Sequence, residues 1–511
     1  MDIVQQAPIL MILCPFLGAF AVSLAGLIQR RWCYPLTVLF TAGSAYAGLG
    51  TLIQVLRTEG GVIRYRMGGW EPPFGIEFRL DALNAAIALM VVVVALLVAI
   101  YSRQTVASET AGKEGHFYTL FLLLTVGVLG ISMTGDAFNL YVFLEISSLS
   151  SYALIAMGRG RAAFSCFNYI IMGTIGASFY LLGVGYLYIK TGSLNMTDIA
   201  RILQEHGLYS SNSVRIGFLF ILIGVWIKMA FVPLHRWLPN AYTFAPSTTS
   251  CLVAPLMTKV SIYVMIRIMF SVFNPEFVFG VGPRSDLVVW LAVIAMMVGS
   301  FYALAKNKLK MMLAYLVIAE VGYMVGGAWL ANATGLTGAI FHILADGLMT
   351  LALFLAAGAI YYKRKSYNIV ATKGLFGKMP FTMGAFAIAA LSMIGIPPTC
   401  GFFSKWYLIS GGIEAGHWGF VVGLLTSSMV NAVLFFRILE RAYFEKPELP
   451  YEPGRQGKNA LNFVERKGVD EAPLTMLAPL WAASLGLVLL GVYSGVVIDF
   501  ISRYVNSVGF Q

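Results

Sequence analysis

The sequence predicts an all-α, polytopic membrane protein with about 14 transmembrane helices. Of its 511 residues 59% are hydrophobic and 12% are charged, and that charged fraction is about half of what a soluble domain carries. The apolar residues form blocks of about twenty, the length that a helix needs to cross hydrocarbon. The net charge of +11 is spread over the loops between these blocks. It therefore does not indicate a nucleic-acid binder, whose basic residues cluster on one face or tail.

The blocks predict the helices in chain order. The N-terminus has neither a basic leader nor a small-residue cleavage site, so we expect the first block to be retained as a span. The predicted spans lie at residues 3–28, 34–56, 82–101, 117–134, 137–157, 164–189, 214–233, 244–273, 287–305, 311–331, 336–362, 381–410, 417–437 and 475–500.

Lysine and arginine alternate from loop to loop, which tests this count. Of the 35 basic residues, the loops after odd-numbered spans hold 22 and the opposite loops hold nine. Because cytoplasmic loops are enriched in lysine and arginine, both termini are predicted to lie outside the cell membrane of a prokaryote. An odd number of spans would break the alternation.

The spans divide into four segments. We expect spans 1–3 in 1–116, a first repeat of spans 4–8 in 117–273, a second repeat of spans 9–13 in 274–437, and a polar loop with span 14 in 438–511. The two sizeable extramembrane segments, 190–213 and 438–474, are too small for an enzymatic domain.

Four basic residues remain, and all fall inside predicted spans: Lys228, Lys259, Arg267 and Lys405. A lysine at the centre of a bilayer costs about 2.5 kcal/mol or more, so such residues face a hydrated interior or a partner. Arg267 is close to the outer end of its span, where its side chain is expected to reach the interface.

Three acids and one histidine also lie within spans: Glu145, Glu320, Asp346 and His342. His342 and Asp346 are four residues apart, so they share one helical face, and the carboxylate could accept a proton from the imidazole. The alternative for this pair is a polar clamp between helices.

Helix-breaking residues interrupt spans 7 and 12. Lys228 precedes Pro233 by five residues, and Lys405 follows the GIPPTCG segment at 395–401. Broken helices at membrane depth occur where the backbone is shielded or lines a cavity, and corresponding breaks in two halves indicate an inverted-repeat transporter. A desolvated lysine can take up and release a proton as a carboxylate approaches or withdraws, so a row of such groups predicts a proton relay. Structural ion pairs that only fix helix packing are the alternative.

These motifs resemble a known family. GDAFNLYVFLE (135–145), WIKMAFVPLHRWLPNAYTFAPS (226–247), KLKMMLAYLVIAEVGY (308–323) and GIPPTCGFFSK (395–405) are similar to the antiporter-like subunits of Mrp-type cation/proton antiporters, membrane-bound hydrogenases and respiratory complex I. The segments at 68–86 and 184–200 most resemble the D subunit of the Mrp-type multisubunit Na⁺/H⁺ antiporter.

The resemblance implies roles for the charged residues and a multisubunit setting. Glu145, Lys228, Lys259, His342 and Lys405 would form a hydrated polar axis parallel to the membrane. The partners would include a second antiporter-like subunit and small hydrophobic subunits, with H⁺ and Na⁺ as transported ions and no cofactor.

The sequence departs from the family pattern in its second half. In span 11, Asp346 and Thr350 stand where a second histidine and a lysine are common. Glu320 stands where a histidine or glutamine is common. We hypothesise that Asp346 and Glu320 replace the missing basic groups, as proton carriers or as part of a cation site. Because eleven residues follow span 14 in this sequence, we do not expect the long lateral helix of the largest antiporter-like subunits.

Three other functions are alternatives to the antiporter. The same translocation unit could be driven by redox chemistry in a hydrogenase or a complex-I-like enzyme. A haem protein would need histidines paired across helices, whereas only His342 of the five histidines lies deep in a span. A self-sufficient solute permease would also fit the broken helices. No spacing identifies a sodium or metal site, and the five cysteines form no CxxC pair.

Overall fold

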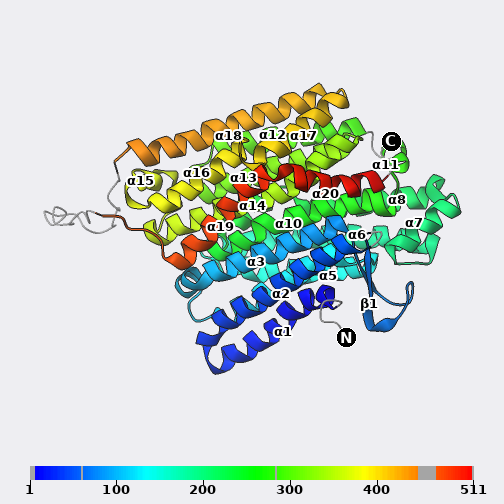
Figure 1. Cartoon of the computed structure of the whole chain (residues 1–511), viewed down its shortest axis with the longest axis horizontal. Helices are drawn as coiled ribbons and strands as arrows, with labels where there is room; N and C mark the ends of the chain where they lie inside the picture. The colour runs from blue at the N-terminus through cyan, green and yellow to red at the C-terminus, as the bar shows by residue number, and fades with distance from the viewer. Residues whose placement is uncertain (1–5, 59–60, 282–284, 447–467, 509–511) are drawn as a thin grey trace.

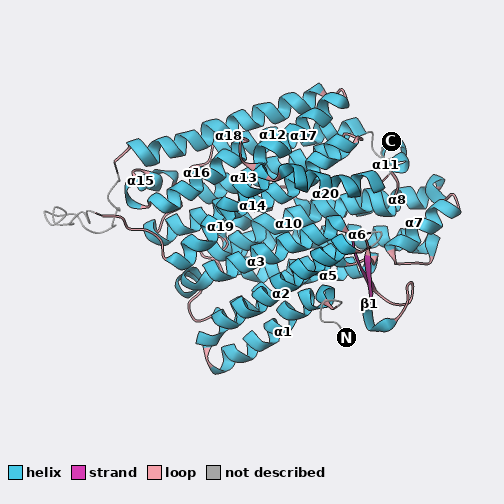
Figure 2. Ribbon diagram, viewed as in Figure 1, coloured by secondary structure: helices cyan, strands magenta, loops and turns pink. Residues whose placement is uncertain are grey.

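Long helices lying side by side form almost all of the protein in its computed structural model (Figures 1 and 2). The structure describes residues 6–58, 61–281, 285–446 and 468–508. Within these ranges, 13 helices are long and apolar enough to cross a membrane. They are α1 Ala7–Ile28, α2 Cys33–Arg57, α3 Ala82–Glu109, α4 Glu114–Met133, α5 Ala137–Ala156, α6 Ala162–Thr191, α8 Asn212–Met229, α10 Ser247–Arg267, α12 Ser285–Leu304, α13 Leu309–Trp329, α14 Ala333–Arg364, α18 Trp418–Phe444 and α19 Leu474–Val492.

Shorter elements complete the chain. Helices α16 and α17 together make one more crossing, because they are the two halves of the broken span 12. The short elements are α7 Met196–Glu205, α9 Leu238–Phe244, α11 Pro275–Val281, α15 Leu375–Lys378, α16 Pro380–Ile394, α17 Cys400–Glu414, α20 Ser494–Ser507, strands β1 Ile63–Arg66 and β2 Glu77–Leu80, and the single turns η1 Arg30–Trp32, η2 Met67–Gly69, η3 Leu208–Ser210, η4 Ile268–Val272 and η5 Ile369–Thr372.

The predicted all-α polytopic fold is confirmed, and its boundaries change at the C-terminal end. Helix α18 continues to Phe444, so the predicted polar loop 438–474 is shorter than expected, and its residues 447–467 lie outside the described part of the chain. The predicted span 475–500 is two helices, because the chain bends at Tyr493 between α19 and α20. Figure 1 shows both in red across one face of the bundle, packed against α3 and α14.

The two predicted breaks share one backbone design. Helix α8 ends before Ala230 (φ 59°) and α16 ends before Gly395 (φ 96°), so each helix stops at a residue in the left-handed region. Each stop is followed three residues later by a proline in a cis peptide bond, Pro233 or Pro398. Because proline has no N–H to donate, the helical ladder cannot resume at once.

The common break places the five-helix repeats in register. Helices α4, α5, α6, α8 with α9, and α10 correspond in order to α12, α13, α14, α16 with α17, and α18. Because five is an odd number of crossings, the first repeat begins on one side of the membrane and ends on the other. The second repeat begins on the side where the first one ended, so it is inverted relative to the first.

The two ends of the bundle differ in their loops. We call the end with the loops after odd-numbered spans the basic side, and the other end the hairpin side. The hairpin side holds the antiparallel pair β1 and β2 and the short helix α7, none of which the sequence pattern predicted. Arg267 lies at this end as expected, but its guanidinium pairs with Asp81, the N-cap of α3, at 2.7 Å and 2.8 Å.

Helix α19 packs directly on the break in span 12. Gly491 is the contact point, since a Cβ atom there would overlap the carbonyl oxygen of Pro398 and the backbone of Thr399. The glycine therefore lets the last span support the non-helical backbone of the second repeat.

We predict that Gly491→Ala lowers the stability of the assembled protein by about 1–3 kcal/mol, the usual cost of overpacking a well-packed contact. The measurement is the thermal unfolding midpoint in mild detergent. Gly495→Ala is the matched control, because a Cβ atom at Gly495 meets nothing within 4 Å. Equal midpoints for the two variants would contradict the close approach.

Candidate functional site

The first charged pair inside the membrane joins α5 to the broken span of the first repeat. Lys228, in the last turn of α8, places Nζ 3.2 Å from Oε1 of Glu145 and donates a hydrogen bond of 2.7 Å to Ser148 Oγ. The Lys228 side chain is 5% exposed and that of Glu145 is 23% exposed. The lysine is therefore enclosed, and its carboxylate partner reaches the outside of the bundle.

The second pair joins the two repeats. Lys259 on α10 lies 2.7 Å from Oδ2 of Asp346 on α14, and both side chains are completely buried. Lys259 Nζ also donates to Thr350 Oγ1 at 3.3 Å, and Thr350 in turn donates to Asp346 Oδ1 at 2.8 Å. The two residues that depart from the family pattern in span 11 thus hold the central lysine between them.

The third pair is a histidine and a glutamate, and its partner differs from the expected one. His342 Nε2 lies 2.6 Å from Glu320 Oε2, and His342 Nδ1 lies 2.8 Å from Ser404 Oγ. The expected proton acceptor for His342, Asp346, pairs instead with Lys259 on α10. The sequence showed that the two residues share a helix face, but it could not show which neighbouring helix each one meets.

The hydrogen-bond partners of His342 imply that the imidazole and the Glu320 carboxyl group share one proton. Ser404 donates its own proton to the Gly401 carbonyl at 3.1 Å, so its oxygen accepts from Nδ1–H of the imidazole. The short contact between His342 Nε2 and Glu320 then needs a second proton, which either the imidazole or the carboxyl group carries. Moving that proton across 2.6 Å interconverts an ion pair and a neutral pair.

Lys405 differs from the other lysines, because backbone carbonyls and a hydroxyl hold it. Its ammonium donates to the Met393 carbonyl at 2.7 Å and to Ser428 Oγ at 3.0 Å, and it lies 5.0 Å from the ring centroid of Tyr323. The break in span 12 leaves the last carbonyls of α16 without helical partners. A cation at this helix end satisfies them and is favoured by the helix dipole.

These groups form a contiguous polar path through the second repeat. His342 and Asp346 are one turn apart on α14, about 6 Å along the helix axis, and Ser404 directly precedes Lys405. Among the described residues, no direct hydrogen bond connects the Glu145–Lys228 pair to the Lys259–Asp346 pair. Buried polar atoms along the path, including Glu320 Oε1 and Thr258 Oγ1, have no hydrogen-bond partner in the protein. Such atoms normally bind water.

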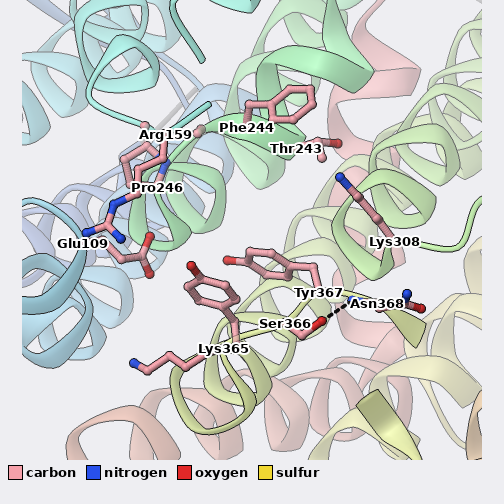
Figure 3. Close-up of a pocket in the computed structure, with 13 residues that line it drawn as sticks. Glu109, Arg159, Thr243, Phe244, Pro246, Lys308, Lys365, Ser366, Tyr367 and Asn368 are labelled. Carbon is pink, nitrogen blue, oxygen red and sulfur yellow. Dashed lines mark hydrogen bonds between the residues drawn. The ribbon is translucent and has the colours of Figure 1, made fainter. Parts of the chain in front are cut away.

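A cavity of about 410 Å³ opens on the basic side, at the start of the helix that carries Lys259 (Figure 3). Glu109, at the end of α3, accepts hydrogen bonds from the Ser247 amide at 2.7 Å and the Ser247 hydroxyl at 2.5 Å. The Tyr367 hydroxyl is 2.5 Å from the same serine oxygen. Burial raises the pKa of Tyr367 well above its ordinary value, so this hydroxyl stays protonated.

Lys310 lies beside this cavity and corrects the loop assignment. Its place in the sequence predicted a loop lysine, but it is in the first turn of α13 and only 1% exposed. Its ammonium donates to the Ala245 carbonyl at 2.5 Å and lies 5.0 Å from the centroid of the Tyr367 ring. Glu109 and Tyr367 were not predicted as site residues, because each lies in a predicted loop, where polar residues are ordinary.

No cluster of three or more His, Cys, Asp or Glu side chains that could hold a metal ion occurs in the described ranges. The five cysteines are free thiols, four of them buried. The titratable groups therefore act here as pairs, and each pair is held between two helices.

An inverted-repeat bundle with two broken helices and paired charges in its core defines the class of antiporter-like membrane subunits. The chain belongs to the family described as NADH:quinone oxidoreductase/Mrp antiporter, TM, whose model matches residues 134–430. That segment contains both breaks and the three pairs Glu145–Lys228, Lys259–Asp346 and Glu320–His342.

Relatives in this family carry two kinds of name. The chain is 42% identical to the NADH-quinone oxidoreductase N subunit of Desulforudis audaxviator, over 97% of this chain and 98% of that protein. It is 30% identical to the Na(+)/H(+) antiporter D subunit of Bacillus subtilis, over 89% of this chain and 90% of that protein. Among solved structures, a chain of the membrane-bound sulfane sulfur reductase, an archaeal respiratory membrane complex, matches with a TM-score of 0.86 and 28% identity, covering 98% of each chain.

We predict strong energetic coupling between Lys259 and Asp346. Asp346→Leu leaves an unpaired ammonium in a fully buried site and should cost about 3–5 kcal/mol of stability. Lys259→Met leaves an unpaired carboxylate there and should cost a similar amount. The double variant removes both charges and should recover most of that loss. Thermal unfolding of the assembled complex measures all three. Additive losses in the double variant would show that the two charges do not depend on each other.

Proposed function

We propose that this chain is the proton-translocating subunit of a multisubunit membrane complex. The proposal rests on the titratable groups buried in both repeats: Glu145–Lys228, Lys259–Asp346, Glu320–His342 and the carbonyl-bound Lys405. Ion pairs that serve only helix packing would not need a histidine and a glutamate to share a proton at 2.6 Å.

The pairs suggest how a proton moves along the path. When Lys259 gives its proton to Asp346, both groups become neutral and their attraction is lost. When the proton leaves Asp346 towards the Glu320–His342 pair, one turn away on α14, the carboxylate regains its charge and Lys259 must take up another proton. Asp346 is thus the proton carrier at the junction of the repeats. Unchanged transport in an assembled Asp346→Asn variant would contradict this role.

The cavity on the basic side is the proposed access to the central lysine. Its lining includes Pro246, the residue directly before α10. Lys259 lies twelve residues beyond the first residue of that helix, Ser247, which is about 18 Å along the helix axis. Glu109 lines this cavity, accepts hydrogen bonds from Ser247 and can bind an incoming proton. The carbonyl-bound Lys405 would pass protons on through the second repeat.

The complex that drives this transport has two candidates. The motifs of the sequence favour an Mrp-type Na⁺/H⁺ antiporter in the cell membrane of a prokaryote, with both termini outside and with small hydrophobic subunits and a second antiporter-like subunit as partners. The 42% identity to a protein named as a quinone oxidoreductase subunit favours proton pumping within a redox enzyme. The described pairs would serve either driving force.

We predict that Lys228→Ala abolishes proton movement, because it removes the charge that responds to Glu145. Proton transfer by a positioned side chain contributes about a hundredfold or more, so the loss should be of that order. The measurement is proton flux in vesicles that hold the assembled complex. Lys190→Ala is the matched control, since Lys190 is exposed at the end of α6. Full flux in an assembled Lys228→Ala complex would refute the relay.

The partners decide between the two driving forces. The native membrane is solubilised gently, the tagged chain is captured, and the co-purifying subunits are identified by mass spectrometry. The antiporter predicts small hydrophobic subunits and a second antiporter-like chain without redox proteins. Partners bearing iron–sulfur clusters or nickel would instead establish redox coupling.

A further inference from the structure

Two adjoining cavities open on the hairpin side, away from the polar path described above. The first, of about 590 Å³, lies between α2, α3, α14, α19 and α20 and is lined almost entirely by aliphatic and aromatic side chains. The second, of about 520 Å³, lies next to it at the ends of α2 and α3 and contains Arg79, Asp81 and Arg503. Leu56, Phe500 and Arg503 line both cavities, so the apolar and polar spaces meet along α20.

The apolar cavity has the depth of one leaflet. Its lining on α3 runs from Ala86 to Val93, and Val93 is eleven residues beyond the start of the helix, about 16 Å along its axis. Half of the hydrocarbon core of a bilayer is about 15 Å thick. On α14 the lining residues Leu344 and Leu348 lie about 16 and 22 Å along the axis from the first residue of that helix, Ala333. A fatty acyl chain that starts at this surface would fill the cavity.

The polar cavity holds positive charge that the protein does not neutralise. Arg64 and Arg79 are directly opposite each other in the hairpin, a cross-strand arrangement that repulsion disfavours. The nearby Asp81 is engaged by Arg267 through both carboxylate oxygens. Arg79 Nη1 donates to Thr197 at 2.8 Å, and its buried Nε has no hydrogen-bond partner in the protein.

Arg503 adds a second unneutralised cation at the junction of the cavities. It is exposed, and it forms no hydrogen bond or ion pair with another residue in the described part of the chain. The exposed Asp499, one turn earlier on α20, lines the apolar cavity. Burial and the neighbouring Arg267 lower the pKa of Arg79 more than the carboxylates of Asp81 and Glu77 raise it.

We propose that this pair of cavities binds one phospholipid, with an acyl chain between α3, α14 and α20 and the phosphate between Arg79 and Arg503. Guanidinium groups bind phosphate through parallel hydrogen bonds, and the phosphodiester supplies the anion that both arginines lack. The bound lipid would fill the gap beside the bend at Tyr493 and attach α20 to the bundle. This site is independent of the proposed proton path.

The test measures lipid retention by the whole complex. The assembled protein is purified in mild detergent, exchanged against phosphatidylglycerol or a diacylglycerol with the same chains, and analysed by native mass spectrometry. Arg503→Gln should weaken phosphatidylglycerol binding about fivefold, the effect of removing one basic contact near a lipid surface. Ala86→Phe, which fills the apolar cavity, should weaken it independently of charge. The matched control Arg201→Gln removes an exposed arginine that Asp198 and Glu205 already neutralise, so retention should not change.

Each outcome decides the proposal. Selective retention of phosphatidylglycerol over diacylglycerol, reduced by Arg503→Gln and by Ala86→Phe but not by Arg201→Gln, supports it. Equal retention by all variants would overturn it. Displacement of the bound lipid by inorganic phosphate alone would overturn the lipid proposal and leave only an anion site. Cross-linking of a neighbouring protein to Val497 in the complex would also overturn it, because a protein would then cover this face. Because proton flux is not the readout, failure here leaves the proposed function unaffected.

Discussion

The cost of placing a charge in hydrocarbon governs the core of this protein. Each lysine buried there would be unfavourable by several kcal/mol without a partner, and each has one of a different kind. Lys228 has a carboxylate that reaches the outside of the bundle, Lys259 has a carboxylate that is completely buried, and Lys405 has the carbonyl end of a broken helix. The helices that supply these partners must stay in place, so the charges and the packing determine each other.

The broken helices follow from the same constraint. A helix that ends inside the membrane exposes carbonyl groups which water cannot satisfy there. In the second repeat, Lys405 donates to the carbonyl of Met393, so the ammonium and the helix end satisfy each other. In the first repeat, the lysine precedes the break instead and turns to Glu145. The two repeats therefore use one backbone design for different electrostatic environments, a carboxylate pair in one and a helix terminus in the other.

Much of this architecture can be predicted from the sequence, because it depends on one-dimensional patterns. Apolar blocks, alternating loop charges and the proline-containing breaks are all local, and they predict the spans and the seven titratable residues. Partners across helices are not local. The four-residue spacing of His342 and Asp346 suggested a pair, yet α14 has neighbours on both sides, and the two residues bond to α13 and α10 respectively. Lys310 was misplaced for the same reason, since only the packing of α9 and the chain around Tyr367 encloses it.

The acidic residues of the second repeat acquire their significance from these partners. A lysine in place of Thr350, which lies 3.3 Å from Lys259, or a protonated histidine in place of Asp346 would confront Lys259 with a like charge in a fully buried site, where repulsion is screened least. With an aspartate there, the ammonium is stabilised, and moving one proton neutralises both groups at once. Glu320 does the same for His342, so the second repeat contains two acid–base pairs, one between α14 and α13 and the other between α14 and α10. A proton that moves along α14 passes between two pairs of the same kind, and the charge left on Asp346 is neutralised again when Lys259 takes up its next proton.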